Sequence, residues 1–186
     1  AKDIGDENTQ LYHKFKNITI ACCENRVEGV KRLLKKNPKI DTIILDDAYQ
    51  HRSLHRDVNI LLTEHDDLFT DDSLIPIGRL RENQKEKKRA SIIIVTKCPK
   101  DISELETEFI KSKIKPKINQ ELYFSFINRH RFVNMTTLKT QDLKKRENYI
   151  LITGIQNSKH LLSFLSDEKI KIKHQFWRMN HWSAPA

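Results

Sequence analysis

Glycine is scarce in this sequence. Gly5, Gly29, Gly78 and Gly154 are the four glycines among 186 residues. None of them begins a Gly-x-x-x-x-Gly-Lys-Ser/Thr sequence, the loop whose backbone N–H groups hold nucleotide phosphates. These residues therefore contain no P-loop.

Cysteine and long apolar runs are also scarce. Cys22, Cys23 and Cys98 have neither the spacing of metal ligands nor the even number of a disulfide framework. This usage favours a reducing, cytoplasmic setting. No apolar run approaches the length of a membrane span, and no signal peptide opens the chain.

Positive charge, in contrast, is abundant. The chain has 34 Lys and Arg residues against 25 Asp and Glu, a formal charge of +9. Such an excess suits a phosphorylated substrate, a nucleic acid or an anionic membrane surface without choosing among them. Runs such as 85–89 and 144–146 are interpreted, taken singly, as solvated basic surface.

Apolar segments alternate with amphipathic ones along the chain. We expect strands at 18–22, 42–45, 58–62, 91–96, 122–127, 149–152 and 170–176, and helices at 8–14, 27–36, 101–113 and 158–165. This alternation predicts an α/β fold with a largely parallel sheet flanked by helices. We expect residues 1–120 to form a core and residues 121–186 to form connecting strands and a smaller C-terminal α/β lobe.

The segment 43–51 carries the strongest chemical signal. Its apolar run ends in Asp46 and Asp47, followed by Gln50 and His51. The carboxyl ends of parallel strands open into the ligand crevice of α/β sheets, and paired carboxylates suit Mg²⁺. A plain strand-to-turn junction explains the same residues equally well, because Asp is a common turn residue.

Four motifs occur in an order that resembles one family. They are Gly5-Asp6-Glu7, Arg26-Val27-Glu28-Gly29, Leu45-Asp46-Asp47-Ala48-Tyr49-Gln50-His51 and Leu74-Ile75-Pro76-Ile77-Gly78-Arg79-Leu80-Arg81-Glu82. Together they resemble bacterial tetraacyldisaccharide 4′-kinase, the kinase of lipid A biosynthesis in Gram-negative bacteria. The family usually has Asp-Asp-Gly-Phe-Gln-His and Pro-Ala-Gly-Pro-Leu-Arg-Glu, so Ala48, Tyr49, Ile77 and Arg79 depart from its pattern.

The resemblance implies an activity and a location. It implies a P-loop-type kinase that moves the γ-phosphoryl group of ATP, with Mg²⁺, to the 4′-hydroxyl of an acylated glucosamine disaccharide 1-phosphate. The enzyme would be cytoplasmic and peripheral at the inner-membrane surface, and the resemblance leaves no role for a nucleic acid. In the family the P-loop precedes Gly-Asp-Glu, so the resemblance implies that this chain is part of a longer parent kinase. Residues 1–120 would then be an incomplete kinase core that lacks the P-loop strand and helix.

The resemblance also assigns residues. Asp6 matches the proposed catalytic base, with Glu7 beside it, and Arg26 and His51 complete the expected catalytic group. Asp46 and Asp47 match the metal-binding acids. Arg81, Glu82 and Gln50 are expected to contact the nucleotide.

Simpler explanations stand beside these roles. Asp6 has a ready alternative as a helix N-cap, Arg26 as a surface charge in a first helical turn, and His51 as a buried, merely hydrogen-bonded residue. The end of the chain, residues 175–186, departs from the family pattern; His181 could stand in for the family's histidine partner of the base.

A second function class stays open at this stage. The positive charge, together with Tyr123, Phe124, Phe126 and Arg129, could form a stacking and phosphate surface of a basic nucleic-acid-binding α/β module without catalysis. The alternation of these aromatic residues is equally typical of a strand core.

Overall fold

The fold is built around an apolar strand, β2 (Ile92–Thr96), in a computed structural model that describes residues 6–128, 132–145, 147–155 and 158–177. β2 consists almost entirely of β-branched residues, which favour strands. Ile93 and Val95 have no exposed surface. β2 is the middle strand of three, in the order β1-β2-β3, and this central position explains its apolar character.

The two neighbours of β2 complete the sheet. β3 (Glu121–Phe124) runs parallel to β2, with Ile92 opposite Glu121 and Val95 opposite Phe124. β1 (Ile60–Glu64) lies on the other side of β2 from β3. Just before these two strands begin, the Ser91 N–H donates to the Asn59 carbonyl at 2.8 Å. Two 3₁₀ helices, η1 (Phe69–Asp71) and η2 (Gln84–Arg89), lie in the long connection from β1 to β2.

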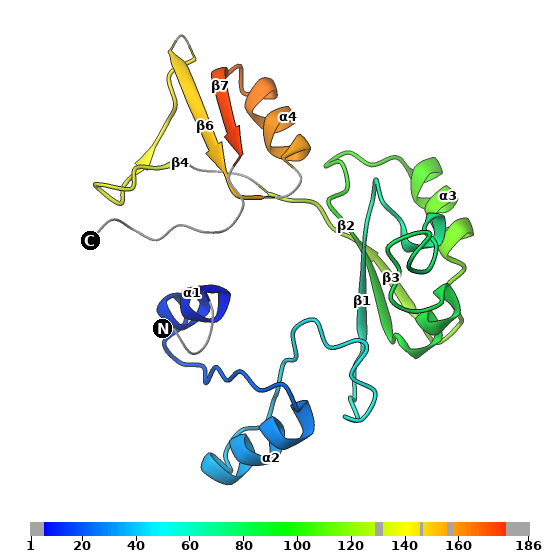
Figure 1. Ribbon diagram of the computed structural model, residues 1–186. Coiled ribbons are helices and arrows are strands. Elements are labelled where there is room, and N and C mark those ends of the chain that lie inside the picture. The colour runs from blue at the N-terminus through cyan, green and yellow to red at the C-terminus, as the bar shows by residue number, and fades with distance from the viewer. Residues whose placement is uncertain (1–5, 129–131, 146, 156–157, 178–186) are drawn as a thin grey trace. The chain divides into compact units, whose positions relative to one another are not determined.

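Helix α3 (Glu104–Ile114) connects β2 to β3 and lies beside the sheet (Figure 1). The Ser103 side chain caps its first turn by accepting the Glu106 N–H at 3.2 Å. Ile110 and Ile114 are buried, so the helix contributes its apolar stripe to the core. This β-α-β unit confirms the predicted α/β class with parallel strands.

The described residues fall into two compact units. One comprises those up to Val95 together with Ser103–Phe124, and the other comprises Thr96–Ile102 and those from Ser125 onwards. β3, which the sequence analysis assigned to the second part, thus pairs within the first unit. The limits 1–120 and 121–186, and the description of the first part as an incomplete kinase core, stay predictions.

The second unit holds a smaller α/β arrangement. β6 (Asn148–Thr153) and β7 (Lys171–Trp177) are parallel, and α4 (Lys159–Asp167) connects them (Figure 1). β4 (Phe132–Val133) and β5 (Thr140–Gln141) form a short antiparallel pair.

Two further helices come early in the chain, and two predicted strands there are wrong. α1 spans Asp6–Lys14 and α2 spans Arg26–Lys36, but segments 18–22 and 42–45 have no regular secondary structure. Ile44, expected in a buried strand, is 89 % exposed. A strand needs a neighbour to complete its hydrogen bonds. Neither segment pairs with a strand within the part of the chain that the structure describes.

Candidate functional site

Asp46 and Asp47 lie in a tight turn rather than at a strand end. The Asp46 carboxylate accepts the Asp47 N–H at 3.0 Å, and Asp47 has a positive φ of 43°. Asp is one of the few non-glycine residues that adopts this conformation readily. The next turn follows at once, since the His51 N–H donates to the Ala48 carbonyl at 3.0 Å. The two carboxylates are therefore exposed to solvent at the start of a turn that backbone hydrogen bonds hold together.

The structure brings two of the four motifs together. Arg81 Nη1 lies 3.3 Å from Asp47 Oδ2, although 34 positions separate them in the sequence. Both side chains are well exposed, so the pair contributes little to stability. Its importance is positional: a carboxylate expected to bind metal and a guanidinium expected to bind phosphate are neighbours.

The three residues expected to contact the nucleotide share one hollow in the surface. Gln50, Arg81 and Glu82 all line it. The other lining residues are Tyr49, Leu61, Phe69, Leu80, Asn83, Gln84, Glu86 and Lys87. The lining therefore combines apolar side chains with polar groups, as ligand sites commonly do.

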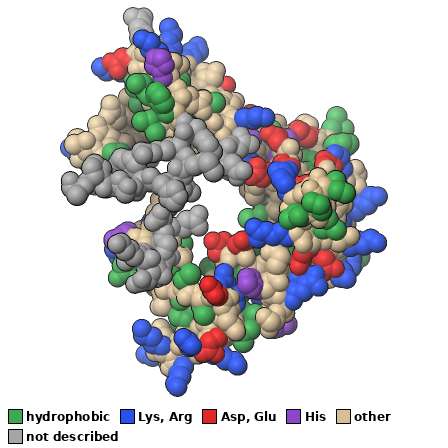
Figure 2. All heavy atoms as spheres, viewed as in Figure 1, with side chains coloured by type: hydrophobic (Ala, Val, Ile, Leu, Met, Phe, Trp, Pro, Cys, Tyr) green, Lys and Arg blue, Asp and Glu red, His purple; other side chains and the backbone are tan. Residues whose placement is uncertain are grey.

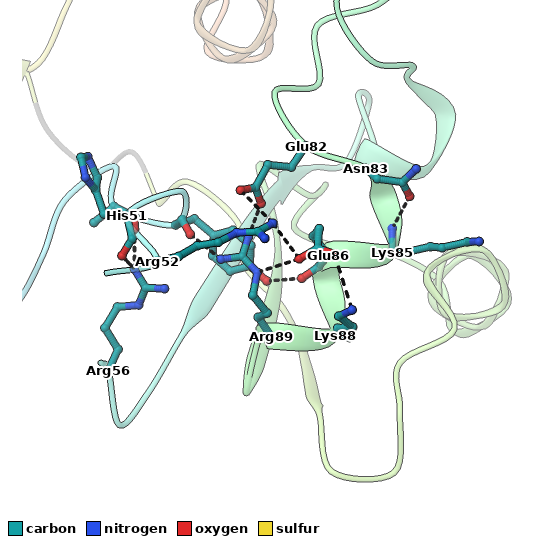
Figure 3. Close-up of polar contacts among 11 residues, drawn as sticks. His51, Arg52, Arg56, Glu82, Asn83, Lys85, Glu86, Lys88 and Arg89 are labelled. Carbon is teal, nitrogen blue, oxygen red and sulfur yellow. Dashed lines mark hydrogen bonds and ion pairs between the residues drawn. The ribbon is translucent and has the colours of Figure 1, made fainter. Parts of the chain in front are cut away.

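Beside this hollow lies a group of four charged residues that we call the Arg89 cluster: Arg52, Glu82, Glu86 and Arg89 (Figure 3). Arg52 Nη2 lies 3.3 Å from Glu82 Oε1 and 2.9 Å from Glu86 Oε2. Arg89 contacts the same two carboxylates, through Nη2 to Glu82 and through Nε to Glu86 Oε2 at 3.2 Å. Each carboxylate thus lies between two guanidinium groups.

Tyr49 links residues 46–50, which we call the Asp46–Gln50 turn, to this cluster. Its hydroxyl donates to the Glu86 carbonyl at 2.9 Å, and its ring lies 4.3 Å from the Arg89 guanidinium carbon. Burial raises the pKa of the Tyr49 hydroxyl above its ordinary value, and the nearby Glu82 and Glu86 carboxylates raise it further, while Arg89 lowers it. The phenol therefore stays a neutral hydrogen-bond donor.

Arg56 also stabilises this turn. Its Nη1 donates to the Ala48 carbonyl at 2.6 Å and to the His51 carbonyl at 3.0 Å. The His51 ring is partly buried and points away from the Arg89 cluster (Figure 3). The backbone of His51 thus has a structural part, and the catalytic role of its ring stays a prediction.

The other expected catalytic residues lie on the first two helices. Asp6 and Glu7 open α1, and their side chains lie outside the described part of the structure. Arg26 opens α2, where its guanidinium donates to the Cys23 carbonyl, and Asn25 caps the helix by accepting the Glu28 N–H at 3.1 Å. The roles of Asp6, Glu7 and Arg26 in catalysis stay predictions.

The carboxylates fit Mg²⁺ by their chemistry. Mg²⁺ in phosphoryl-transfer sites keeps several waters and needs only one or two carboxylates beside the substrate phosphates. Asp46 and Asp47 offer that number of exposed carboxylates. Among the described residues there is no group of three or more His, Cys, Asp or Glu side chains that could hold a metal ion by itself.

The basic residues do not form a separate patch on the face shown in Figure 2. Lys and Arg side chains lie there among Asp and Glu side chains. Within the run 85–89, Lys87 and Arg89 are only partly exposed, so the interpretation of this run as solvated surface is wrong for these two residues. Lys87 Nζ donates to the Ile114 carbonyl and, at 2.8 Å, to that of Lys115, which anchors the end of α3.

Sequence comparison decides the family. The sequence model of the family described as "LpxK: Tetraacyldisaccharide-1-P 4'-kinase" matches residues 1–183. The chain belongs to this family. The match takes in most of the segment 175–186 that departs from the expected pattern; residues 178–186, including His181, lie outside the described residues.

Individual relatives carry the name of the same family. The chain is 38 % identical over 169 residues to the tetraacyldisaccharide 4′-kinase of Flavobacterium johnsoniae, covering 90 % of this chain and 50 % of that protein. It is 44 % identical over 163 residues to the enzyme of the same name from Bacteroides fragilis, covering 83 % of this chain and 43 % of that one. The chain thus spans about half the length of the curated relatives it matches.

A solved structure gives the same result for the fold. The crystal structure of LpxK from Aquifex aeolicus in complex with ATP has a TM-score of 0.65 and 24 % identity. The match covers 98 % of this chain and 55 % of that one. This similarity confirms the fold of the kinase family. No helix in the described ranges has the length and apolar character to cross a membrane.

Proposed function

We propose that the protein carrying this chain transfers the γ-phosphoryl group of ATP to the 4′-hydroxyl of a tetraacylated glucosamine disaccharide 1-phosphate in lipid A biosynthesis. Family membership supports the reaction. The structural observation that carries the proposal is the contact between Asp47 and Arg81, which joins two family motifs beside the hollow that Gln50 and Glu82 line.

Phosphoryl transfer needs mainly positioning and charge stabilisation. Asp46 and Asp47 would hold Mg²⁺, which neutralises charge on the phosphates when bound. Arg81 suits phosphate oxygens because its planar guanidinium donates two parallel hydrogen bonds. Gln50 and Glu82 would orient the nucleotide from the same hollow.

The acceptor side of the reaction rests on the family motifs. Asp6 would accept the proton of the 4′-hydroxyl, with Glu7 beside it, and Arg26 and His51 would help to hold the substrate phosphates and the acceptor. We propose further that the enzyme is cytoplasmic and works at the inner-membrane surface, where the charge of +9 on these 186 residues suits anionic lipid head groups.

A radiolabel assay tests the reaction. The full-length enzyme should transfer label from γ-labelled ATP to the acylated disaccharide 1-phosphate, whereas these 186 residues alone, without a P-loop, should transfer none. Failure of the full-length enzyme to label the lipid would refute the proposal.

The family match gives no support to the nucleic-acid-binding alternative, and a binding assay tests that alternative directly. Retention of a nucleic-acid oligomer that falls steeply as salt rises, without ATP binding, would favour the nucleic-acid-binding module instead.

A further inference from the structure

Arg89 contacts two separate segments of the proposed site, although the proposed reaction gives it no role. Its side chain is only 18 % exposed. It contacts Glu82 and Glu86 (Figure 3). It also donates through Nη1 to the Tyr49 carbonyl at 2.7 Å and lies over the Tyr49 ring. A single guanidinium therefore contacts both the Asp46–Gln50 turn and the segment that carries Glu82.

The backbone of Arg89 is fixed to the core. It ends η2 directly before the buried Ala90 and β2. The buried side chain of Gln120 donates to the Lys87 and Ala90 carbonyls, each at 2.7 Å, and so holds η2 against β3. Arg89 thus extends from the end of η2, which Gln120 bonds to the start of β3, to two segments that have little regular structure of their own.

Only arginine suits this position. Its planar fork presents several N–H donors in fixed directions, whereas a lysine ammonium is a single point of charge. Nη1 is used by the Tyr49 carbonyl and Nη2 by Glu82, while Nε lies 3.2 Å from Glu86 Oε2 as an ion pair without hydrogen-bond geometry. A lysine could keep one of these contacts but not all three.

We propose that Arg89 is a positioning residue, which fixes the Asp46–Gln50 turn and Glu82 in one geometry so that their carboxylates face the magnesium nucleotide together. The part that concerns magnesium rests on the proposed function. The part that concerns geometry does not, because it follows from the Arg89 contacts alone.

Hydrogen–deuterium exchange tests the geometry without ATP or metal. The N–H groups of His51 and Arg52 donate to the Ala48 and Gln50 carbonyls of the turn. In Arg89→Lys, these N–H groups should exchange on the order of five-fold faster, the effect of losing one net hydrogen bond. Exchange within α3 should not change.

Lys88→Gln is the matched control. Lys88 is the next residue in the chain, and its Nζ lies 3.6 Å from the same Glu86, but its side chain is 57 % exposed. This variant loses a positive charge on the same carboxylate without touching the Tyr49 carbonyl, so its exchange should match wild type.

Magnesium dependence tests the consequence in the full-length enzyme. Groups that orient metal ligands typically change metal affinity by about 10–100-fold when replaced. Arg89→Lys should therefore raise the Mg²⁺ concentration for half-maximal activity by about ten-fold or more, while Lys88→Gln should leave it unchanged. A merely structural role would lower the melting temperature and the active fraction without moving this concentration.

The outcomes decide the proposal separately from the function. If Arg89→Lys matches Lys88→Gln in both exchange and magnesium requirement, the proposal is wrong. If Arg89→Lys does not fold, Glu86→Gln, which removes one of the carboxylates, decides in its place: a raised magnesium requirement supports the proposal and an unchanged one overturns it. An inactive wild-type enzyme would refute the proposed function, and the exchange experiment would then decide the role of Arg89 alone.

Discussion

The loop before Arg81 has no space for a side chain at Gly78. A Cβ at this position would lie 2.2 Å from Asp72 Oδ1, 2.3 Å from the Ser73 carbonyl oxygen and 2.7 Å from the Ser73 nitrogen. Two of these atoms belong to the backbone and cannot turn away as a flexible side chain would. Gly78→Ala therefore forces the loop to open.

The cost follows from the contacts that must move. Shifting the Ser73 carbonyl breaks its hydrogen bond from the Leu80 N–H at 3.0 Å, a net loss of about 1 kcal/mol. Overpacking of this kind usually costs about 1–3 kcal/mol in total. We expect Gly78→Ala to lower the free energy of unfolding by about 2 kcal/mol, and to lower activity because Arg81 and Glu82 follow directly.

Urea denaturation measures this change, with Ile77→Ala as the control. Ile77 is the preceding residue in the same loop and is 90 % exposed, so its truncation should change stability by less than about 0.5 kcal/mol. Equal stability of Gly78→Ala and wild type would refute the steric argument. So would an Ile77→Ala variant as destabilised as Gly78→Ala.

Three further predictions concern single residues. Asp46→Asn or Asp47→Asn in the full-length enzyme should raise the magnesium requirement in kinetic assays while the melting temperature stays unchanged, because Asn keeps the shape and loses the charge; equal losses of stability and activity would indicate a turn residue only. Asp6→Asn should lower kcat by roughly 10²–10⁴ with little change in KM for ATP, because Asn keeps the shape of Asp and loses the proton acceptor; a kcat within a few-fold of wild type would make Asp6 only a structural residue in the first turn of α1. The pKa of Tyr49 is raised above 10.0, so the folded protein holds the phenol proton more tightly than the unfolded protein does. The contribution of Tyr49 to the stability of the fold therefore falls as the pH rises past about 10. Melting temperatures of Tyr49→Phe should therefore decline less steeply above this pH, and parallel curves for the two proteins would contradict the burial argument.

The sequence predicted elements well where the pattern reports a local property. The helix at 27–36 has an Asn cap and an apolar stripe, and 91–96 is a β-branched run; both formed within one residue of the expected limits. The failures at 18–22 and 42–45 have a common cause. A strand depends on a neighbouring strand as well as on its own residues, and the apolar pattern of a segment does not say whether that neighbour is present.

The sequence proposed the residues of the candidate site, whose roles stay predictions, but it did not show how they are connected. The motifs identified Asp47 and Arg81, and their contact followed only from the fold. The sequence did not indicate a role for Arg89, because this residue ends a charged run that resembles solvated surface and its partner Tyr49 lies 40 positions away. Its place directly before a buried strand was the available signal, since a residue there tends to lie against the core.

The central claim is that the Asp46–Gln50 turn and the Arg81–Glu82 segment form the phosphate and metal part of one kinase site. The most direct test is a crystal structure of the full-length enzyme with Mg²⁺ and a non-hydrolysable ATP analogue. We predict an Asp46 or Asp47 carboxylate oxygen on the ion, at about 2.1 Å or across one bound water, and the Arg81 guanidinium on a phosphate oxygen. A nucleotide bound with both segments away from its phosphates and metal would contradict the claim.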